Sequence, residues 1–268
     1  MQYALVNGVR SQPQKGIEGV CESCNSRLIS KCGDFIVHHW AHYNSKYCDK
    51  WWESETIWHR NWKNQFPEEF REVNFKDVSS GEVHRADIHT SFGITVEFQH
   101  SLINSDERVA REGFYNNLIW VIDGTRRKND YKRFRKKSHY LTSYKHKPNI
   151  FQVSNIEEVF PSEWSNSSAY VIFDFMPIAD SVEFFDTGVL YCLFPQKVGG
   201  AGIVAKMSAN SFVRSVIEGE WIGKSSKFLE ELKKDDILFR TKEEEVRHKL
   251  KLYDMNTQRI PNKRHWRF

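Results

Sequence analysis

The chain has 268 residues, enough for one or two domains that bury a core without disulfides. Hydrophobic residues make up 40% and aromatic residues 14%, which excludes disordered, low-complexity, collagen-like and coiled-coil chains. The 39 Lys and Arg exceed the 35 Asp and Glu by a formal charge of +4, too little to identify a nucleic-acid binder. No apolar run approaches about 18 residues and no signal-peptide pattern is present, so we expect a cytoplasmic protein with no membrane association.

Cysteines gather near the N-terminus, where four of the five lie within the first 50 residues. In a cytoplasmic protein such clustering favours a metal site over disulfides. Cys21 and Cys24 form a CxxC motif, and an HHWAH segment follows it. Two thiolates and two imidazoles suit a tetrahedral structural zinc ion. We therefore predict a zinc-ribbon-like module over residues 1–50, with zinc bound by Cys21, Cys24, His39 and His42.

The spacing leaves the ligand set partly open. Cys32 or Cys48 could replace one histidine, and His38 directly precedes His39. The alternative interpretation is that these cysteines are reduced structural residues without a metal.

A helix is predicted over residues 53–66, because Pro67 ends it and large aromatic residues repeat at helical spacing. Its buried stripe consists of Trp58, Trp62 and Phe66. A polar stripe beside it consists of Glu55, His59 and Lys63. This polar stripe fits either a functional site or a solvent-facing ladder of charges.

Three short strands are predicted next, over residues 71–78, 82–89 and 93–101. If the last two form a hairpin centred on Phe92, Asp87 lies opposite Glu97. Gln99 then shares the same face of the sheet, whereas a one-residue change of register would separate the two carboxylates.

The remaining elements alternate between helices and strands, which predicts a mixed α/β or α+β fold with helices flanking a mixed sheet. They are a helix at 104–118, strands at 118–122, 149–154, 169–175 and 188–194, and helices at 208–219 and 226–252.

Two carboxylates that converge from paired strands repel each other, and a divalent cation removes this repulsion. Carboxylate oxygens suit Mg²⁺ or Mn²⁺, which can activate a water for attack on a phosphodiester. We predict Asp87 and Glu97 as the ligands of a catalytic Mg²⁺ or Mn²⁺, with Gln99 orienting the water. Lys63 could supply positive charge, Glu55 could bind the metal directly or through water, and His59 could contact phosphate or transfer a proton.

A basic stretch follows the predicted nuclease elements. Residues 126–147 contain ten Lys and Arg but one acidic residue, Asp130, and the tail after residue 240 is also basic. Basic residues interleaved with aromatic ones suit nucleic-acid binding, although a solvated helix face is the plainer interpretation. The candidate contacts are Arg133, Arg135, Lys136 and Lys137.

Five motifs taken in order resemble the competence protein CoiA family: CxxC…HHWAH, ETIWHRNWK, HRADI, VEFQHS and RVAREGFYNN–LIWVIDG. This resemblance covers roughly residues 1–125 and implies a zinc-finger-like segment joined to a restriction-endonuclease-like PD-(D/E)XK nuclease core. It implies that Asp87 and Glu97 bind the catalytic metal and that Gln99 stands in an ExQ variant of the usual ExK. Trp40 and Thr56 depart conservatively from the family's Phe and Ser.

The resemblance also implies roles for residues around these motifs. Those that match the family are Glu55, His59, Lys63, Arg85, Ser101, Arg108, Arg111 and Tyr115. Arg85, which precedes the metal-binding Asp, is a candidate nucleic-acid contact, and Arg108 and Arg111 could contact DNA phosphate or form buried ion pairs. The expected organisation is a zinc module at 1–50, a nuclease core at 51–125 and a basic nucleic-acid-binding region at 126–268.

The expected function is therefore a Mg²⁺- or Mn²⁺-dependent DNA nuclease, in DNA uptake and recombination or in phage defence. The alternatives are a DNA-binding accessory protein with an inactive nuclease-like core and an RNA-directed nuclease. The expected partners are single- or double-stranded DNA, other DNA-processing proteins and a second copy of the chain, for which exposed aromatic residues near 164 and 266 are candidates.

Overall fold

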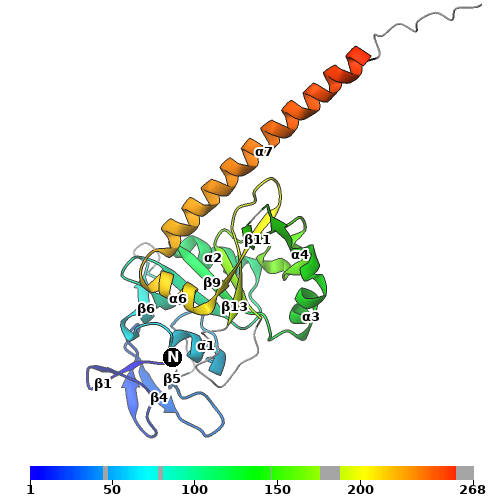
Figure 1. The fold of residues 1–268 in the computed structure, drawn as a ribbon. Coiled ribbons are helices and arrows are strands. Elements are labelled where there is room, and N and C mark those ends of the chain that lie inside the picture. The colour runs from blue at the N-terminus through cyan, green and yellow to red at the C-terminus, as the bar shows by residue number, and fades with distance from the viewer. Residues whose placement is uncertain (45–47, 78–80, 146, 176–187, 258–268) are drawn as a thin grey trace, which may run out of the picture. The chain divides into compact units, whose positions relative to one another are not determined.

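The computed structural model describes residues 1–44, 48–77, 81–145, 147–175 and 188–257. The chain divides into two compact units, Met1–Ile222 and Gly223–Phe268 (Figure 1). Both β-sheets lie in the first unit, and the described part of the second unit continues helix α7. Among the described residues, none of the helices combines the length and apolar character needed to cross a membrane.

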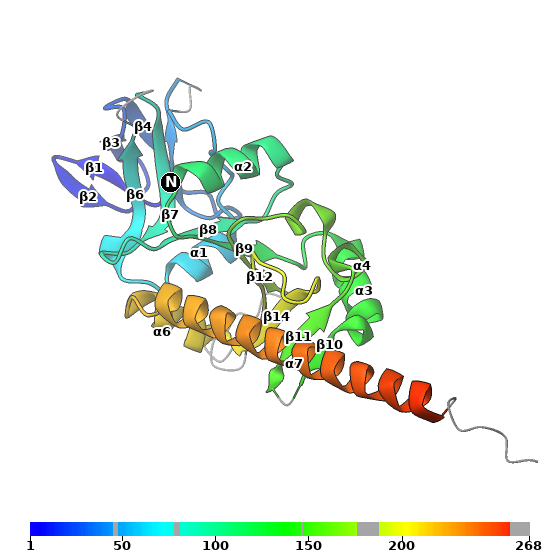
Figure 2. The same ribbon diagram turned by 90° about the horizontal axis from the view of Figure 1, so that it is seen from above.

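The N-terminal sheet has five strands in the order β2-β1-β3-β4-β5 (Figure 2). Its strands are β1 Ala4–Val6, β2 Val9–Ser11, β3 Glu18–Val20, β4 Arg27–Lys31 and β5 His39–His42. Asn7 and Gly8 both have positive φ angles and form the tight turn between β1 and β2. The core of this sheet is small and consists of Met1, Ala4, Cys21, Leu28 and Trp40.

The second sheet has nine strands in the order β10-β11-β14-β13-β12-β9-β8-β7-β6. These strands are β6 Arg71–Lys76, β7 Val83–His89, β8 Thr95–Gln99, β9 Leu118–Asp123, β10 Thr142–Tyr144, β11 Lys147–Val153, β12 Tyr170–Asp174, β13 Val189–Leu193 and β14 Gly202–Ser208. Strands β8, β9 and β12 are parallel and the other pairs are antiparallel. The predicted mixed sheet is therefore present, and it continues well beyond residue 125.

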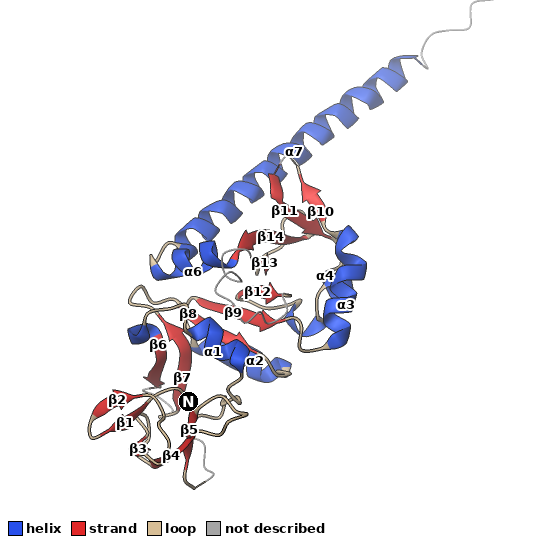
Figure 3. Ribbon diagram, turned by 60° about the horizontal axis from the view of Figure 1, so that its bottom comes forward, coloured by secondary structure: helices blue, strands red, loops and turns tan. Residues whose placement is uncertain are grey.

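Helices lie against the nine-stranded sheet (Figure 3). They are α1 Ile57–Lys63, α2 Ser105–Phe114, α3 Lys128–Lys137, α4 Ile156–Val159 and α6 Ala209–Ile217, and α7 follows at Trp221–Thr257. Trp120 and Ile122 of β9 belong to the main core, which also contains Phe134 of α3 and Ile156 of α4.

Helix α1 packs through the tryptophan stripe that the sequence predicts. The indole Nε1 groups of Trp58 and Trp62 each donate a hydrogen bond of 3.0 Å to Asp174 Oδ2, and Asp174 is fully buried on β12. The Trp62 ring stacks on Phe98 of β8. These contacts hold α1 beside the strands that carry the predicted catalytic residues.

The helix α1 is shorter than predicted. It begins after Thr56, whose side chain accepts the His59 backbone N–H in a capping box. Glu53 and Glu55 therefore lie in the extended segment before the helix, so Glu55, His59 and Lys63 do not form one helical ladder.

Several other expectations differ from the structure. Strand β14 was not predicted, although it pairs with both β11 and β13. Only part of the basic stretch at 126–147 is helical: Lys128–Lys137 form α3, whereas Thr142–Tyr144 form β10 and β11 begins at Lys147. Trp164 is 2% exposed in the core and so offers no surface for dimer formation, and position 266, like the rest of the basic tail from 258 on, lies outside the described residues.

Candidate functional site

Asp87 and Glu97 meet where strands β7 and β8 separate. The β7–β8 register pairs Ile88 with Val96 and His89 with Thr95, which places Asp87 opposite Glu97 as predicted. Beyond this point each carboxylate accepts a backbone N–H of the neighbouring strand. Asp87 N donates to Glu97 Oε1 at 3.3 Å, and Phe98 N donates to Asp87 Oδ2 at 3.0 Å. The two carboxylates are thus held by a reciprocal pair of hydrogen bonds.

These carboxylates line a polar cavity of about 70 Å³, which is room for roughly five water molecules. The other charged or titratable residues in its lining are Asp49, Glu53, Glu55, His59, Lys63, Glu72, Arg85 and Arg111, together with the Met1 amine. Five of the six predicted catalytic residues therefore share this cavity: Glu55, His59, Lys63, Asp87 and Glu97.

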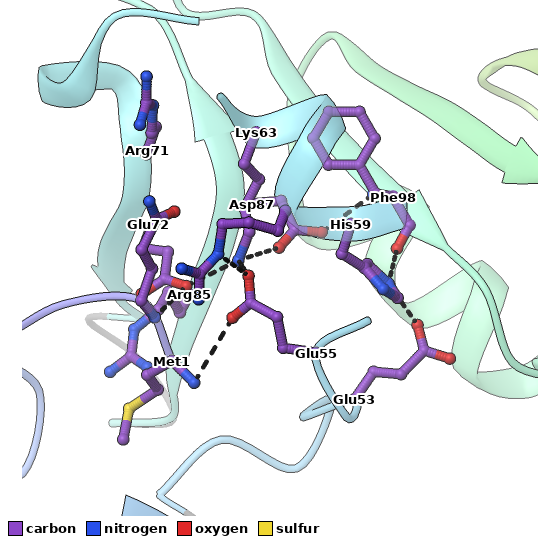
Figure 4. Close-up of polar contacts among 12 residues, drawn as sticks. Met1, Glu53, Glu55, His59, Lys63, Arg71, Glu72, Arg85, Asp87 and Phe98 are labelled. Carbon is purple, nitrogen blue, oxygen red and sulfur yellow. Dashed lines mark hydrogen bonds and ion pairs between the residues drawn. The ribbon is translucent and has the colours of Figure 1, made fainter. Parts of the chain in front are cut away.

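Lys63 is a buried cation of the cavity lining that lies between several carboxylates (Figure 4). Its Nζ lies 2.8 Å from Glu55 Oε1 and 2.8 Å from Glu72 Oε1, and 3.8 Å from Asp87 Oδ1. Burial opposes the charged form, but Glu55, Glu72 and Asp87 together raise the pKa of Lys63. Lys63 is therefore held as a cation beside Asp87.

Glu72 was not singled out by the sequence, because nothing in its neighbourhood marks it. It lies in β6 with a φ of 50°, a left-handed conformation that is strained for glutamate. Gln2 N donates to both carboxylate oxygens at 2.8 Å, and Lys63 contacts one of them. These contacts hold the Glu72 carboxylate against the cavity.

Glu53 was also missed, although it stands two residues before Glu55. Its Oε2 lies 3.1 Å from His59 Nε2 (Figure 4). Its carboxylate also accepts the backbone N–H groups of His100 and Ser101. His59 Nε2 also lies 2.9 Å from the Phe98 carbonyl oxygen. Because His59 is 4% exposed and tied to α1, β8 and Glu53, the contacts show it holding the cavity wall together.

Gln99 turns away from the Asp87–Glu97 pair. Its Nε2 donates to Glu53 Oε1 at 3.3 Å and to the Ser101 carbonyl at 3.1 Å. It lines a smaller neighbouring cavity of about 20 Å³ that also contains His100 and Asp123. Gln99 is therefore the one predicted catalytic residue that does not line the cavity of Asp87 and Glu97.

The pKa values of the acidic groups in the cavity shift in two directions, although burial raises all of them. Burial raises the pKa of Asp87, and it raises the pKa of Glu97 well above its usual value with the help of the Asp87 charge. For Glu55 and Glu72 burial acts in the same direction but is outweighed, and the Lys63 charge lowers the pKa of both. Around Asp87 and Glu97, the neighbouring cations are therefore too few to offset the effect of burial on the pKa.

The arginines that the resemblance assigned to nucleic-acid binding lie in buried contacts. Arg111 Nη1 donates to Glu97 Oε2 at 3.1 Å, and Arg108 Nη1 donates to Glu112 Oε1 at 2.7 Å. Both arginines are 5% exposed. Arg85 faces the N-terminal sheet, where it contacts Ser23. These three residues serve ion pairs and internal contacts because their strands and helix turn them inward.

A second cluster lies in the N-terminal sheet and joins Cys21, Cys24, His42 and Cys48. Their ligand atoms all lie within 4.8 Å of one another, so the cluster could hold a metal such as zinc. The Cys21 and Cys48 sulfurs are 3.7 Å apart, and Cys24 Sγ is 3.3 Å from His42 Nε2. Zn–S bonds of about 2.3 Å in a tetrahedron separate two sulfurs by about 3.8 Å, so this spacing fits zinc.

The cluster does not include His39, the expected fourth ligand, and contains Cys48 instead. His39 and His42 are three residues apart in strand β5, and residues with that spacing point to opposite faces of a strand. His39 Nδ1 instead lies 2.8 Å from the Val37 carbonyl oxygen. Cys32 and His38 also lie outside the cluster.

Helix α3 displays its basic residues on the side away from buried Phe134. Arg135 and Lys136 are exposed. Arg133 is partly engaged, because it lies 3.9 Å from Asp130, and Lys137 lies 3.8 Å from Glu158. The helix therefore offers two of the four predicted contacts freely to solvent.

Comparison with known proteins adds no relative: no family model, curated protein or solved structure matches the chain. The similarity to the CoiA family rests on the sequence motifs alone.

Proposed function

We propose that the protein is a divalent-metal-dependent nuclease with its active site at Asp87 and Glu97. The observation that carries this proposal is the pair of carboxylates held reciprocally by backbone N–H groups where β7 and β8 separate. Such a pair presents hard oxygen ligands toward one cavity, and these are the ligands that Mg²⁺ and Mn²⁺ prefer.

The charge of the cavity supports a bound divalent cation. Six carboxylates line it, whereas its positive groups are Lys63, Arg85, Arg111 and the Met1 amine. If every one of these groups is ionised, two negative charges are left over. The pKa values of Asp87 and Glu97 are the ones raised, so their charged forms are the least stabilised in the cavity. A divalent cation bound by both carboxylates would stabilise these two charges.

When bound, Mg²⁺ or Mn²⁺ would polarise a phosphoryl oxygen and lower the pKa of a coordinated water. Asp87 and Glu97 would hold this ion. Lys63, at 3.8 Å from Asp87, would stabilise negative charge at the phosphate, the task for which the related ExK pattern uses its lysine. Gln99 and Glu53, which are hydrogen-bonded to each other, would border the path of the substrate.

Zinc at Cys21, Cys24, His42 and Cys48 would have a structural role in this proposal. All four ligand positions are supplied by the protein, which is typical of a structural and not a catalytic zinc site.

DNA is the proposed substrate. The exposed basic residues of α3 favour a polyanion, and the motif resemblance to the CoiA family favours a role in DNA uptake and recombination. Phage defence is the alternative setting for the same chemistry.

The test is cleavage of end-labelled single-stranded and double-stranded DNA, and of RNA, with Mg²⁺ or Mn²⁺. We expect Asp87→Asn and Glu97→Gln to abolish cleavage while the protein still folds, because each replacement keeps the shape of the side chain and Arg111 retains its ion pair with Glu107. Glu69→Gln is the matched control, since Glu69 is an exposed glutamate outside the cavity, and it should cleave like wild type. Cleavage that survives in both cavity variants would overturn the assignment.

The second candidate is a DNA-binding accessory protein with an inactive nuclease-like core. The contact that favours it is Arg111 on Glu97, because this guanidinium competes with a metal for the carboxylate. DNA binding by the wild type without cleavage of any substrate would support this candidate, and cleavage of RNA but not DNA would redirect the substrate assignment.

A further inference from the structure

Arg85 joins the Cys/His cluster to the carboxylate cavity. Its Nη2 donates to Cys21 Sγ at 3.6 Å and to Ser23 Oγ at 3.1 Å, and its Nε donates to Asn74 Oδ1 at 3.0 Å. Arg85 also lines the cavity and lies in β7, two residues before Asp87. One side chain thus contacts a ligand of the cluster and belongs to the strand that carries the catalytic carboxylate.

Asp49 makes a second connection between the two sites. It directly follows Cys48 in the chain and lines the cavity. Its Oδ2 accepts the backbone N–H of Arg85 at 2.9 Å, and its Oδ1 lies 3.0 Å from His84 Nδ1. The segment that supplies the Cys48 thiolate is therefore bonded to the same stretch of β7.

The ligand set gives Arg85 an electrostatic reason for its position. Three thiolates and one neutral imidazole around Zn²⁺ leave a single net negative charge, whereas two thiolates and two imidazoles would leave none. The substitution of Cys48 for the expected His39 therefore creates a charge that needs a nearby cation. The Arg85 guanidinium beside Cys21 supplies this cation, and its three acceptors fix its orientation.

We propose that Arg85 is a positioning residue that couples metal occupancy of the Cys21–Cys24–His42–Cys48 cluster to the order of the Asp87–Glu97 cavity. With the metal bound, the anionic cluster holds the guanidinium, and β7 and Asp49 are fixed with it. Without the metal, Arg85 loses that partner, and the backbone around Asp87 and Glu97, where β7 and β8 separate, becomes less ordered. The cluster thereby regulates the active site of the proposed nuclease. The biological meaning of this coupling rests on the proposed function, whereas the coupling itself can be measured without nuclease activity.

Three backbone amides report the order of the cavity directly. Arg85 N, Asp87 N and Phe98 N donate to the carboxylates of Asp49, Glu97 and Asp87, respectively. Their hydrogen-exchange rates depend on these side chains being in place. The experiment compares the exchange of these amides in zinc-loaded and zinc-stripped full-length protein and measures zinc affinity by competition with a chromophoric chelator.

In wild type, zinc loading should slow exchange at all three amides. Arg85→Gln should lower zinc affinity by about 10–100-fold, as is typical for loss of a partner to a metal ligand, and should remove the slowing even when zinc is saturating. Arg85→Lys keeps the charge but cannot reach three acceptors, so it should recover part of the zinc affinity and little of the slowing. Arg27→Gln is the matched control, because Arg27 is an exposed arginine of the N-terminal sheet paired with Glu18, and it should match wild type.

The paired variant Ser23→Ala with Asn74→Ala serves if Arg85→Gln does not fold. It removes two acceptors of the guanidinium without burying an unpaired charge, and it should weaken both zinc binding and the slowing. Zinc affinity and exchange in the Arg85 variants equal to those of Arg27→Gln would overturn the proposal. Neither readout uses catalysis, so a protein that cleaves nothing but shows the coupling refutes the nuclease assignment alone.

Discussion

At the scale of single residues, the site is a network of buried charges and not a surface. Lys63 touches Glu55 and Glu72, and Arg111 touches Glu97, all with side chains that are less than a tenth exposed. A buried charge without a partner is costly, so each of these groups depends on the others. The alternative interpretation, that Glu55, His59 and Lys63 face the solvent, is therefore excluded, because all three side chains are buried.

Lys63→Met should destabilise the protein by about 3–5 kcal/mol, because it leaves the buried carboxylates of Glu55 and Glu72 without their shared cation. Urea unfolding at neutral pH measures this loss. Adding Glu72→Gln to the variant should restore part of the stability. Lys50→Met is the control, since Lys50 is an exposed lysine, and it should change stability by less than about 0.5 kcal/mol. Equal effects at the two lysines would contradict the buried network.

Glu112 provides a test of pH dependence away from the proposed metal sites. Burial opposes ionisation, but hydrogen bonds from Ser167, Ser168 and Arg108 lower the pKa of Glu112 below its ordinary value of 4.5. Its contribution to stability is therefore complete above about pH 4.5 and is lost as the pH falls through the folded-state pKa. The difference in unfolding free energy between wild type and Glu112→Gln should shrink from pH 7 to pH 3. A constant difference would show that the Glu112 charge is not stabilising.

At the scale of elements, the periodicity of each segment decides which side chains meet. Strand β5 turns His39 away from His42, whereas the hairpin of β7 and β8 places Asp87 against Glu97. Helix α3 buries Phe134 and so turns its basic residues outward. Function at this scale follows from which face an element must bury.

Helix α3 should contribute phosphate contacts through its exposed residues. Arg135→Gln with Lys136→Gln should weaken DNA binding and reduce the slope of log affinity against log salt by about 2, since each lost contact to double-stranded DNA removes about 0.9. Fluorescence anisotropy across a salt series measures this slope. Lys15→Gln with Lys31→Gln removes the same charge from two exposed positions, one in the turn between β2 and β3 and one in β4, and should leave the slope unchanged. If the salt dependence of DNA binding has the same slope in both double variants, the basic residues of α3 face the solvent and do not contact DNA.

At the scale of the whole molecule, the two sheets differ greatly in the size of the hydrophobic core that supports them. The N-terminal sheet has a hydrophobic cluster of five buried residues, whereas one cluster against the nine-stranded sheet already contains eighteen among the described residues. A core as small as the first rarely supports folding by itself, so a metal at the Cys/His cluster would supply much of its stability.

Removal of zinc should therefore loosen the N-terminal sheet before the larger one. A chelator should open residues 1–50 to limited proteolysis while the β6–β14 sheet stays protected, and added zinc should reverse this change. Mass spectrometry of the fragments measures the order of cleavage. Simultaneous cleavage of both sheets, after verified zinc loss, would contradict a local role for the metal.

The sequence by itself determined most of the elements and the register that faces Asp87 with Glu97, because side-chain period and turn signals are local properties. It also located Cys21, Cys24 and His42 as members of the Cys/His cluster. Only the tertiary structure decided that Cys48 completes the cluster, that Glu53 and Glu72 enter the cavity and that Arg85 faces the thiolates. These contacts join strands and loops distant in the chain, and burial of charge, which selects the partners, depends on the folded surroundings.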